Sequence, residues 1–287
     1  MRFVVERDAL SDGVAWVSRS LSTRPIMPVL LGVVIDAQKN GVHLAGYDLE
    51  TSAKAIITAD VKEEGRVLVS GRLLSDIAKS LPNKPVTISL DGNRVSVISG
   101  SAKFTLPTLP VSDYPNLPEL PSETGRLTGE LFAEAVHQVA IAAGKDDSLP
   151  VLTGVHVEIE ENKLTLAATD RYRLAVRELE WEAPRASASA LIRARTLHDA
   201  SKSLVGSAQV SLALAAPNAQ ERLIGFSTEG KSMTSRMLDG TFPPYRHLLP
   251  SDRSATAIIE VAPLLDSVRR VALVADKTVP LRLTFAP

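Results

Sequence analysis

The segment Leu149 to Leu179 reads LPVLTGVHVEIEENKLTLAATDRYRLAVREL, and it repeats an earlier segment of the chain. The earlier segment lies 122 residues upstream, from Met27 to Ile57, and reads MPVLLGVVIDAQKNGVHLAGYDLETSAKAII. The two align without a gap, and ten of the 31 pairs are identical. Average amino-acid usage gives about two identities by chance over that length. The chain therefore contains an internal duplication.

The duplication continues on both sides of this segment. Upstream, three apolar residues recur at the same offset: Leu10, Val14 and Val17 align with Phe132, Val136 and Val139. Downstream, after one inserted residue, 71–81 (GRLLSDIAKSL) aligns with 194–204 (ARTLHDASKSL). Further along, 112–117 (SDYPNL) corresponds to 240–245 (GTFPPY). These matches predict two copies of one fold.

A third copy begins near the C-terminus. The apolar pattern of the first helix of the repeat occurs again at Pro263, Leu264, Val268 and Val271. Residues 279–281 then repeat the start of a strand. We therefore predict three domains: 1–122, 123–250, and the start of an incomplete third at 251–287. A period near 120 residues indicates tandem domains, because solenoid repeats are about 20 to 50 residues long.

Composition narrows the class of protein. The chain has 287 residues, 45% of them hydrophobic, and its net charge is 32 − 33 = −1. This balance argues against a protein that binds nucleic acid through overall basicity. It has no cysteine, which suits the reducing cytoplasm. The N-terminal MRFVVERDAL has no apolar signal-peptide core, and no run of about 18 apolar residues occurs. We expect a cytoplasmic protein with no membrane partner.

Each copy reads as an α+β unit. In copy one, Leu10, Val14, Val17 and Leu21 have the spacing of an amphipathic helix. Strands are predicted at 2–5, 30–37, 42–46, 53–59 and 66–70, with a type I′ hairpin turn at Asn40-Gly41. A second helix is predicted at 72–81, with Leu73, Leu74, Ile77 and Leu81 facing inward, followed by strands at 86–90, 95–99 and 103–106. The proline-rich segment 107–121 predicts an extended crossing to copy two.

Motifs of catalysis are absent from the sequence. Its five histidines (His43, His137, His156, His198 and His247) are scattered and form no HxH or HExxH pair. The sequence has no nucleophile elbow and no glycine-rich phosphate loop. Asp48 and Asp170 occupy equivalent positions after a strand, which favours a turn-capping role for both over catalysis. We predict no enzyme activity, no metal site and no cofactor.

Basic residues recur on the outward faces of the predicted helices. Arg72 and Lys79 are seven residues apart and so share one helix face, and Arg195, His198 and Lys202 repeat that face in copy two. A solvated helix surface is one interpretation. A concentrated basic face is the other, and it suits contact with phosphates without reading of bases. Aromatic residues, at 4%, provide little for stacking on single strands.

Seven segments of the chain resemble one known family, and they occur in the family's order. They are MRFVVERDAL, RPIMPVLLGVVI with GYDLE, FTLPTLPVSDYPNLP, LPVLTGV with ATDRYRLAV, and DGTFPPYRHLLP. The chain is similar to the bacterial β sliding clamp, the processivity subunit of the replicative DNA polymerase. The resemblance implies tandem repeats of a clamp-type fold, with helices on one face of antiparallel sheets. It implies also that two subunits close head to tail into a ring around duplex DNA.

The resemblance assigns functional residues. Arg24 and Arg72 match DNA-contacting positions of the family, and Lys79, Arg195 and Lys202 join them through helical spacing. A cleft for short peptide motifs of polymerases, the clamp loader and repair proteins would have these residues on its copy-two wall: Leu152, Thr169, Arg171, Tyr172, Arg173, Leu174, Pro243 and Leu248. Some members have Gly-His where this chain has Arg171-Tyr172. Without the resemblance, Leu152, Leu174 and Leu248 would read as ordinary core residues.

The resemblance also predicts a subunit interface. Phe104 and Leu106 on a copy-one edge strand would face Leu273 and Val274 of another subunit. Since the third copy has only 37 residues here, we expect the chain to be mainly monomeric or weakly self-associated, and a chain with a complete third copy to form a homodimer.

Two other functions remain open at the level of sequence. The first is a duplicated interaction scaffold that does not bind DNA, in which the basic faces are only solvated surface. The second, weaker alternative is a hydrolase, which the missing nucleophile-base pattern disfavours. The response of duplex-DNA binding to salt discriminates the clamp from the scaffold.

Overall fold

The fold is described from a computed structural model of the chain. The structure describes residues 1–181, 187–216, 219–250, 252, 255–276 and 279–284. It divides into two compact units, Met1–Phe242 and Pro243–Pro287. The first unit contains copy one and copy two as far as Phe242, and the second contains residues 243–250 and the start of copy three. The predicted boundary between residues 122 and 123 stays a prediction.

Copy one alternates short strands with two helices. In order along the chain it contains β1 (Arg2–Val5), α1 (Arg7–Ser18), β2 (Gly32–Gln38), β3 (Gly41–Tyr47), β4 (Thr51–Ile57), β5 (Asp60–Glu63), β6 (Gly65–Ser70), α2 (Gly71–Ser80), β7 (Val86–Asp91), β8 (Arg94–Ser99) and β9 (Ala102–Leu109).

Copy two follows the same order, except that β5 has no counterpart in the described residues. It contains β10 (Glu123–Leu127), α3 (Gly129–Ala140), β11 (Gly154–Glu160), β12 (Lys163–Thr169), β13 (Leu174–Glu180), β14 (Ala188–Arg193), α4 (Ala194–Leu204), β15 (Val210–Leu214), β16 (Leu223–Thr228) and β17 (Lys231–Arg236). Pro28 and Pro150 each open a 3-10 turn that leads into an equivalent strand, β2 or β11. Proline suits the first position of such a turn because no N–H is needed there. The predicted duplication of the fold is confirmed.

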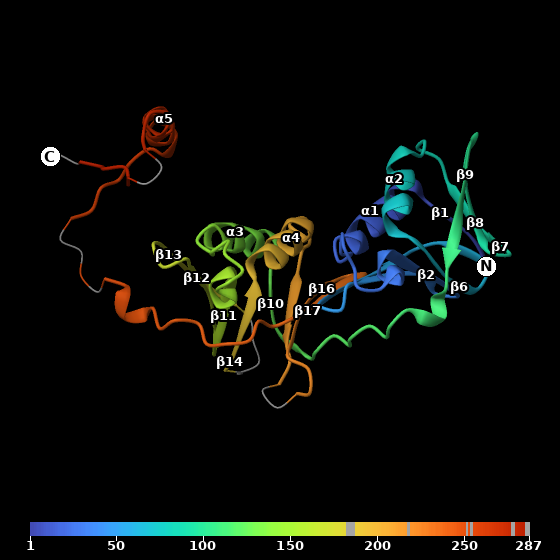
Figure 1. The fold of residues 1–287 in the computed structure, drawn as a ribbon, viewed down its shortest axis with the longest axis horizontal. Coiled ribbons are helices and arrows are strands. Elements are labelled where there is room, and N and C mark those ends of the chain that lie inside the picture. The colour runs from blue at the N-terminus through green and yellow to red at the C-terminus, as the bar shows by residue number, and fades with distance from the viewer. Residues whose placement is uncertain (182–186, 217–218, 251, 253–254, 277–278, 285–287) are drawn as a thin grey trace. The chain divides into compact units, whose positions relative to one another are not determined.

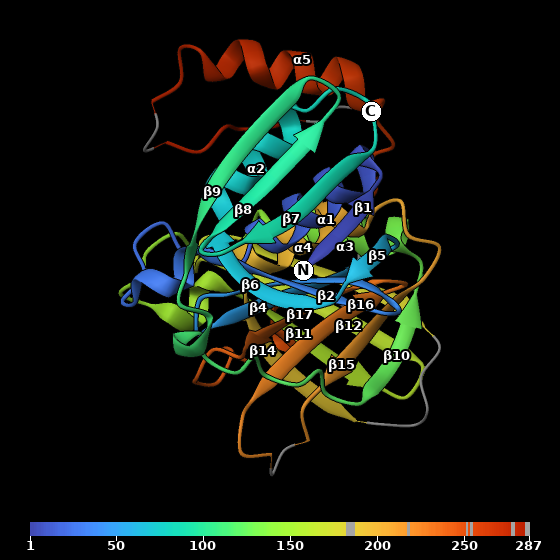
Figure 2. The ribbon, with the colours of Figure 1, turned by 90° about the vertical axis from the view of Figure 1, so that its right-hand side faces the viewer.

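The strands form antiparallel sheets, as predicted. One sheet of copy two has the order β13-β12-β11-β14, and the remaining strands join into a 13-stranded sheet. β17 of copy two pairs with β4 of copy one, from Lys231 opposite Ala55 to Ser235 opposite Thr51. This pairing makes copies one and two a continuous structure (Figures 1 and 2).

The helices cover the sheets in pairs, α1 with α2 and α3 with α4. The apolar residues that aligned between the copies face the sheets and are all buried: Leu10, Val14, Val17, Phe132, Val136 and Val139. Phe132 meets Phe226 of β16 with ring centroids 5.4 Å apart. Figure 1 shows α3 and α4 side by side over the strands of copy two. Their polar residues Glu130, Glu134, Arg195 and Lys202 are exposed.

Several local predictions were wrong. The first hairpin turn is Lys39-Asn40, one residue earlier than predicted, because Gln38 pairs with Gly41. Gly41, with φ of +135°, starts β3 where an added Cβ would lie 2.9 Å from the Ile57 carbonyl oxygen. Leu73 is 42% exposed, because the inward stripe of α2 is formed by Leu74, Ile77, Ala78 and the following Leu81. The short strand β5 was missed, and Leu21 lies beyond the end of α1.

The second unit is small. It contains α5 (Val261–Ala272), which matches the predicted first helix of copy three. No residue of α5 is buried. The strand predicted from Val279 is not formed in the described residues 279–284. The crossing at 107–121 is extended as predicted for most of its length, although β9 continues to Leu109 and Val111–Asp113 form a 3-10 turn.

Candidate functional site

Four cations extend from helices α2 and α4. Arg72 and Lys79 are exposed in the first and last turns of α2. Arg195 and Lys202 are exposed at the two ends of α4, and the Arg195 side chain is 94% exposed. The nearest carboxylate to Arg195 is Asp199, with Nε and Oδ2 3.9 Å apart, which is a weak ion pair at an exposed site. These side chains are available to an external anion.

Arg24 lies in the loop after α1. It is exposed, and its backbone N–H donates to Ser22 Oγ at 3.1 Å. Within the described residues its guanidinium forms no ion pair, so Arg24 is a loop cation facing solvent.

A cavity joins this loop to α4 across the two copies. Its volume is about 270 Å³, and Ser22, Thr23 and Arg195 contribute to its lining. Arg19 spans the junction, because its Nη1 donates to the Asp199 carbonyl oxygen at 3.0 Å. Arg19 was not among the site residues predicted from the sequence. Its basic side chain directly after α1 was a signal, but its partner 180 residues away could not be inferred from spacing.

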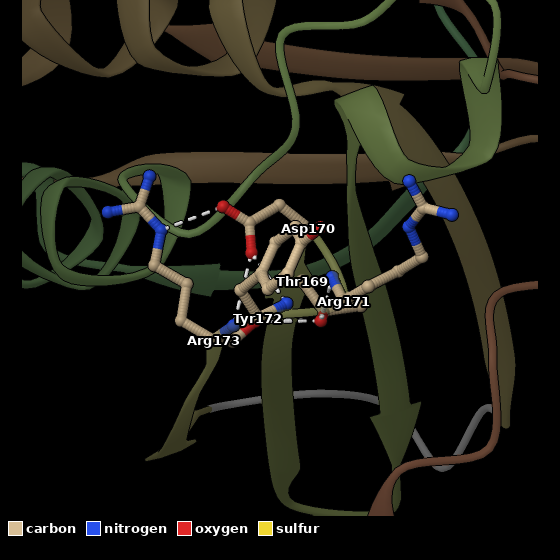
Figure 3. A network of polar contacts seen from close by, with 5 residues as sticks. All are labelled: Thr169, Asp170, Arg171, Tyr172 and Arg173. Carbon is tan, nitrogen blue, oxygen red and sulfur yellow. Dashed lines mark hydrogen bonds and ion pairs between the residues drawn. The ribbon is translucent and has the colours of Figure 1, made fainter. Parts of the chain in front are cut away.

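A tight turn connects β12 to β13, and Figure 3 shows its polar contacts. Asp170 Oδ1 accepts hydrogen bonds from the N–H groups of Tyr172 and Arg173, both at 3.1 Å. Asp170 Oδ2 accepts from Arg173 Nε at 3.0 Å. Thr169 Oγ1 donates to the Arg173 carbonyl oxygen at 2.7 Å. The predicted turn-capping role of Asp170 is confirmed.

Copy one contains the same turn between β3 and β4. Asp48 Oδ1 accepts from the N–H groups of Glu50, at 3.0 Å, and Thr51, at 2.6 Å. The residue after each aspartate is left-handed, with φ of 77° at Leu49 and 79° at Arg171. The capping role predicted for Asp48 is therefore also confirmed.

The two aspartates differ in their electrostatics. Burial raises the pKa of Asp48 against the lowering effect of its two backbone hydrogen bonds. Burial also opposes ionisation of Asp170, but hydrogen bonds from Arg173 and Tyr172 and the Arg173 charge outweigh it and lower the pKa. The copy-two turn therefore holds a stable carboxylate, and its polar contacts fix the direction of the loop tip.

That tip borders a second cavity, of about 370 Å³. Leu149 and Leu152 form apolar parts of its lining, and 171–173 form its rim. Tyr172 is 93% exposed, and Leu174, which begins β13, is half-buried. Leu152 is half-buried as well, so neither leucine is the core residue that the sequence alone suggested.

The remaining residues of the predicted cleft belong to the second unit. In it Pro243 is exposed and Leu248, in the short 3-10 turn Arg246–Leu248, is 63% exposed. The structure brings together six of the eight predicted residues in copy two: Leu152, Thr169, Arg171, Tyr172, Arg173 and Leu174. Pro243 and Leu248 are exposed apolar residues of their own unit.

The predicted interface residues have different environments. Phe104 is half-buried on β9, and Leu273 and Val274 are 85% and 88% exposed just after α5. Leu106 is 0% exposed. The prediction for Leu106 needs correction, because the side chain points into the core of the first unit and is not available to a partner.

The described residues contain neither a helix that could span a membrane nor a cluster of metal-binding side chains. None of the helices there is both long and apolar enough to cross a membrane. In the same residues, no three His, Cys, Asp or Glu side chains gather as a metal site would require.

Comparison with known proteins gives consistent matches along most of the chain. Residues 1–118 match the DNA polymerase III beta subunit, N-terminal domain, and residues 126–244 match its central domain. The beta sliding clamp of Streptomyces coelicolor is 53% identical over 99% of this chain and 76% of its own length. The beta sliding clamp of Micrococcus luteus is 48% identical over 99% of this chain and 92% of its own length.

Solved structures give the same result. The DNA polymerase sliding clamp from Bacillus subtilis superposes with a TM-score of 0.87 at 27% identity, covering 96% of this chain and 75% of that one. A sliding clamp from Pseudomonas aeruginosa bound to griselimycin gives a TM-score of 0.81 at 28% identity, covering 88% of this chain and 69% of that one.

Proposed function

The chain belongs to the DNA polymerase III β subunit family, the β sliding clamps, and on that premise we propose that it encircles duplex DNA and tethers the replicative polymerase for processive synthesis. The observation that supports this role is the set of exposed cations on α2, α4 and the loop after α1, in a chain whose net charge is only −1. A ring holds DNA by topology and needs only enough positive potential to centre the duplex. Strong pairing with many phosphates would oppose sliding.

The clamp has no catalytic role of its own in this proposal. It acts as a docking hub in the cytoplasm for the polymerase, the clamp loader and repair proteins. A separate ATP-driven loader opens the ring, since the sequence contains no nucleotide-binding motif. Arg24, Arg72, Lys79, Arg195 and Lys202 are the proposed DNA-contacting residues.

Partners bind, we propose, at the cleft whose copy-two wall was predicted above. The half-buried Leu152 and Leu174 provide apolar contact area, and the capped turn holds Tyr172 in an exposed position. Exposed aromatic side chains on a rigid turn are typical anchors of peptide interfaces. The family resemblance also assigns Pro243 and Leu248 to this cleft.

Assembly is proposed to follow the head-to-tail arrangement of the family. Phe104 on β9 meets Leu273 and Val274 of another subunit, with Leu106 supporting β9 from the core. The three domains, 1–122, 123–250 and 251–287, are the proposed units of this arrangement.

The DNA role is tested with the double substitution Arg24→Ala and Arg72→Ala. Both residues are exposed, so we expect the free energy of unfolding to change by less than about 0.5 kcal/mol. Duplex affinity at low salt should fall, and the slope of log K against log salt should become shallower by about 0.9 for each lost phosphate contact. Unchanged affinity and slope would favour the interaction scaffold instead.

A further inference from the structure

Two histidines of copy two lie against each other on the helix face. His137 is exposed in the last turn of α3, and His198 is half-buried on α4. Their ring centroids are 6.2 Å apart and the planes differ by 23°, so the imidazoles are stacked. His198 lies between Arg195 and Lys202 along α4, at spacings of three and four residues, which places all three on one helix face.

The duplication supplies an internal comparison for this pair. At the equivalent positions, copy one has Ala15 on α1 and Ser75 on α2. The α1–α2 pair packs on its sheet as the α3–α4 pair does, without an imidazole at either position. The fold therefore does not require histidine there, and the stacked pair is a feature of the copy-two surface.

Imidazole is the side chain that changes charge between about pH 5 and pH 8. Protonation of the pair would extend the cationic row of α4 onto α3. The neighbouring helices and strands carry these charged or titratable residues: Glu130 and Glu134 on α3; Arg195, Asp199 and Lys202 on α4; Arg19 after α1; His156, Glu158 and Glu160 on β11; Lys163 on β12; Arg177, Glu178 and Glu180 on β13; and Arg193 on β14.

We propose that His137 and His198 are further DNA-contacting residues, which add positive charge to the duplex-facing surface as the pH falls. This inference rests on the proposed function, since it assumes that the α3–α4 face meets the duplex. Two imidazoles can add at most two units of positive charge to this face between pH 8 and pH 5.5.

The consequence is a salt dependence that changes with pH. Each cation that meets a phosphate releases counterions and steepens the slope of log K against log salt by about 0.9. We expect the slope for a blunt-ended duplex to be steeper by about 0.9 to 1.8 at pH 5.5 than at pH 8. Duplex affinity at low salt should rise in the same direction.

The test uses the whole 287-residue chain and fluorescence anisotropy with a labelled duplex, over a series of KCl concentrations at each pH. The main variant is His137→Ala with His198→Ser, which places the copy-one residues in copy two and so preserves a pattern that the fold accepts. We expect its slope to be the same at both pH values. The control is His43→Gln, on β3, whose Nε2 lies 3.2 Å from Asn40 Oδ1; it should behave as the unmodified chain does.

A third variant, His198→Lys, gives the position a charge that does not depend on pH. It should have a steep slope at both pH values. A slope that is measurable but identical at pH 5.5 and pH 8 in the unmodified chain would overturn this inference and leave the clamp function standing. A pH effect that persists in the His137→Ala, His198→Ser variant would also overturn it. Absence of duplex binding at both pH values and at the lowest salt would also overturn this inference, whereas the ring function would be judged on a chain that dimerises.

Discussion

Asp48 and Asp170 cap the same turn in the two copies, but their pKa values shift in opposite directions. Burial is the larger cause at Asp48, and a second difference lies at the position three residues after each aspartate. Arg173 adds a charge-assisted hydrogen bond to Asp170, and copy one has Thr51 there instead. Hydrogen bonds to charged groups are worth more than neutral ones. The same backbone turn is thus stabilised by a carboxylate in copy two and penalised for holding one in copy one.

The pH dependence of stability follows from these directions. Because folding lowers the pKa of Asp170, its contribution is complete above the ordinary aspartate pKa and is lost as the pH falls through the folded value. Because folding raises the pKa of Asp48, ionisation of that group destabilises the fold as the pH rises through the folded value. We expect Asp170→Asn to cost about 1 kcal/mol near neutral pH and progressively less in acid.

Asp48→Asn is the matched control. Asparagine keeps an oxygen for the two backbone donors and removes the penalty of a partly buried charge, so it should cost less than Asp170→Asn near neutral pH. Urea denaturation at a series of pH values measures both. A larger loss for Asp48→Asn at neutral pH would contradict this account.

The left-handed residues of the two turns give a second prediction. A non-glycine residue in this region costs about 1 to 2 kcal/mol, and glycine gives back about 0.5 to 1 kcal/mol through the entropy of the unfolded chain. Arg171 is exposed, so Arg171→Gly should stabilise the first unit by up to about 1 kcal/mol. Leu49 packs against the cluster around Tyr47 and Tyr114, so Leu49→Gly should destabilise it. Thermal unfolding of both variants is the measurement, and equal effects of one sign would refute the explanation.

Among the elements, the pairing of β4 with β17 joins the two copies. Trp16 of α1 lies beneath this pairing, and its indole N–H donates to the carbonyl oxygens of Lys54, at 3.0 Å, and Ser232, at 3.2 Å. Lys231 covers the ring at 5.8 Å and pairs with Asp12 at 2.6 Å. One side chain therefore connects a helix of copy one with strands from both copies.

Trp16→Phe keeps most of the apolar contact and removes the indole donor. Trp16 is 3% exposed, so the two carbonyl groups lose a buried partner, and we expect a cost of about 1 to 3 kcal/mol. Hydrogen exchange should become faster at the β4–β17 amides before it does in β11 and β12. Uniform acceleration across the first unit would indicate general loss of packing instead of a weakened junction.

The sequence predicted elements better than the connections between them. Periodic apolar residues identified α1 to α4, because burial of one helix face imposes that spacing. The spacing does not fix the rotation of α2 about its own axis. It therefore did not show that Ala78, and not Leu73, faces inward. The β4–β17 pairing joins segments about 180 residues apart, and nothing in local patterning encodes its register. The same limit hid the contact of Arg19 with Asp199.

The candidate site was predictable to a similar extent. Helical spacing was enough to place Arg72, Lys79, Arg195 and Lys202 on exposed faces. The cleft residues depended on resemblance, because Leu152 and Leu174 look like core residues until the open edge at β13 is seen. Leu106 is the opposite case. The resemblance predicted it as a contact residue, but side chains alternate between the two faces of a strand, and its side chain lies in the core.

For the whole molecule, the decisive property is the contrast between the two units. The first unit buries a continuous core that extends through both copies. In the second, α5 buries no residue, and its apolar side chains Val261, Leu265 and Val271 are 76%, 43% and 52% exposed. A surface must be ordered by packing before it can bind a partner without a large entropic cost.

This contrast leads to a prediction for assembly. Burying Phe104, Leu273 and Val274 would contribute about 1.5 to 3 kcal/mol for each side chain. A stable interface, however, buries on the order of 1,000 Å² or more in well-packed contact, and an isolated helix does not supply that. We therefore expect the 287-residue chain to sediment at micromolar concentration mainly as a monomer, with at most weak self-association. A chain whose third copy is as long as the first two should sediment as a dimer.

The substitution Leu273→Asp tests whether any dimer that is observed forms through the third copy. If the third copy supplies the interface, Leu273→Asp should dissociate the longer chain and leave the sedimentation of the 287-residue chain unchanged, because Leu273 is already 85% exposed there. Arg269→Asp, on the neighbouring α5, is a control that changes charge without removing apolar area. A tight dimer of the 287-residue chain that is lost on Leu273→Asp and kept on Arg269→Asp would show that α5 and its following turn are sufficient. Packing of further residues against α5 would then not be required for dimerisation.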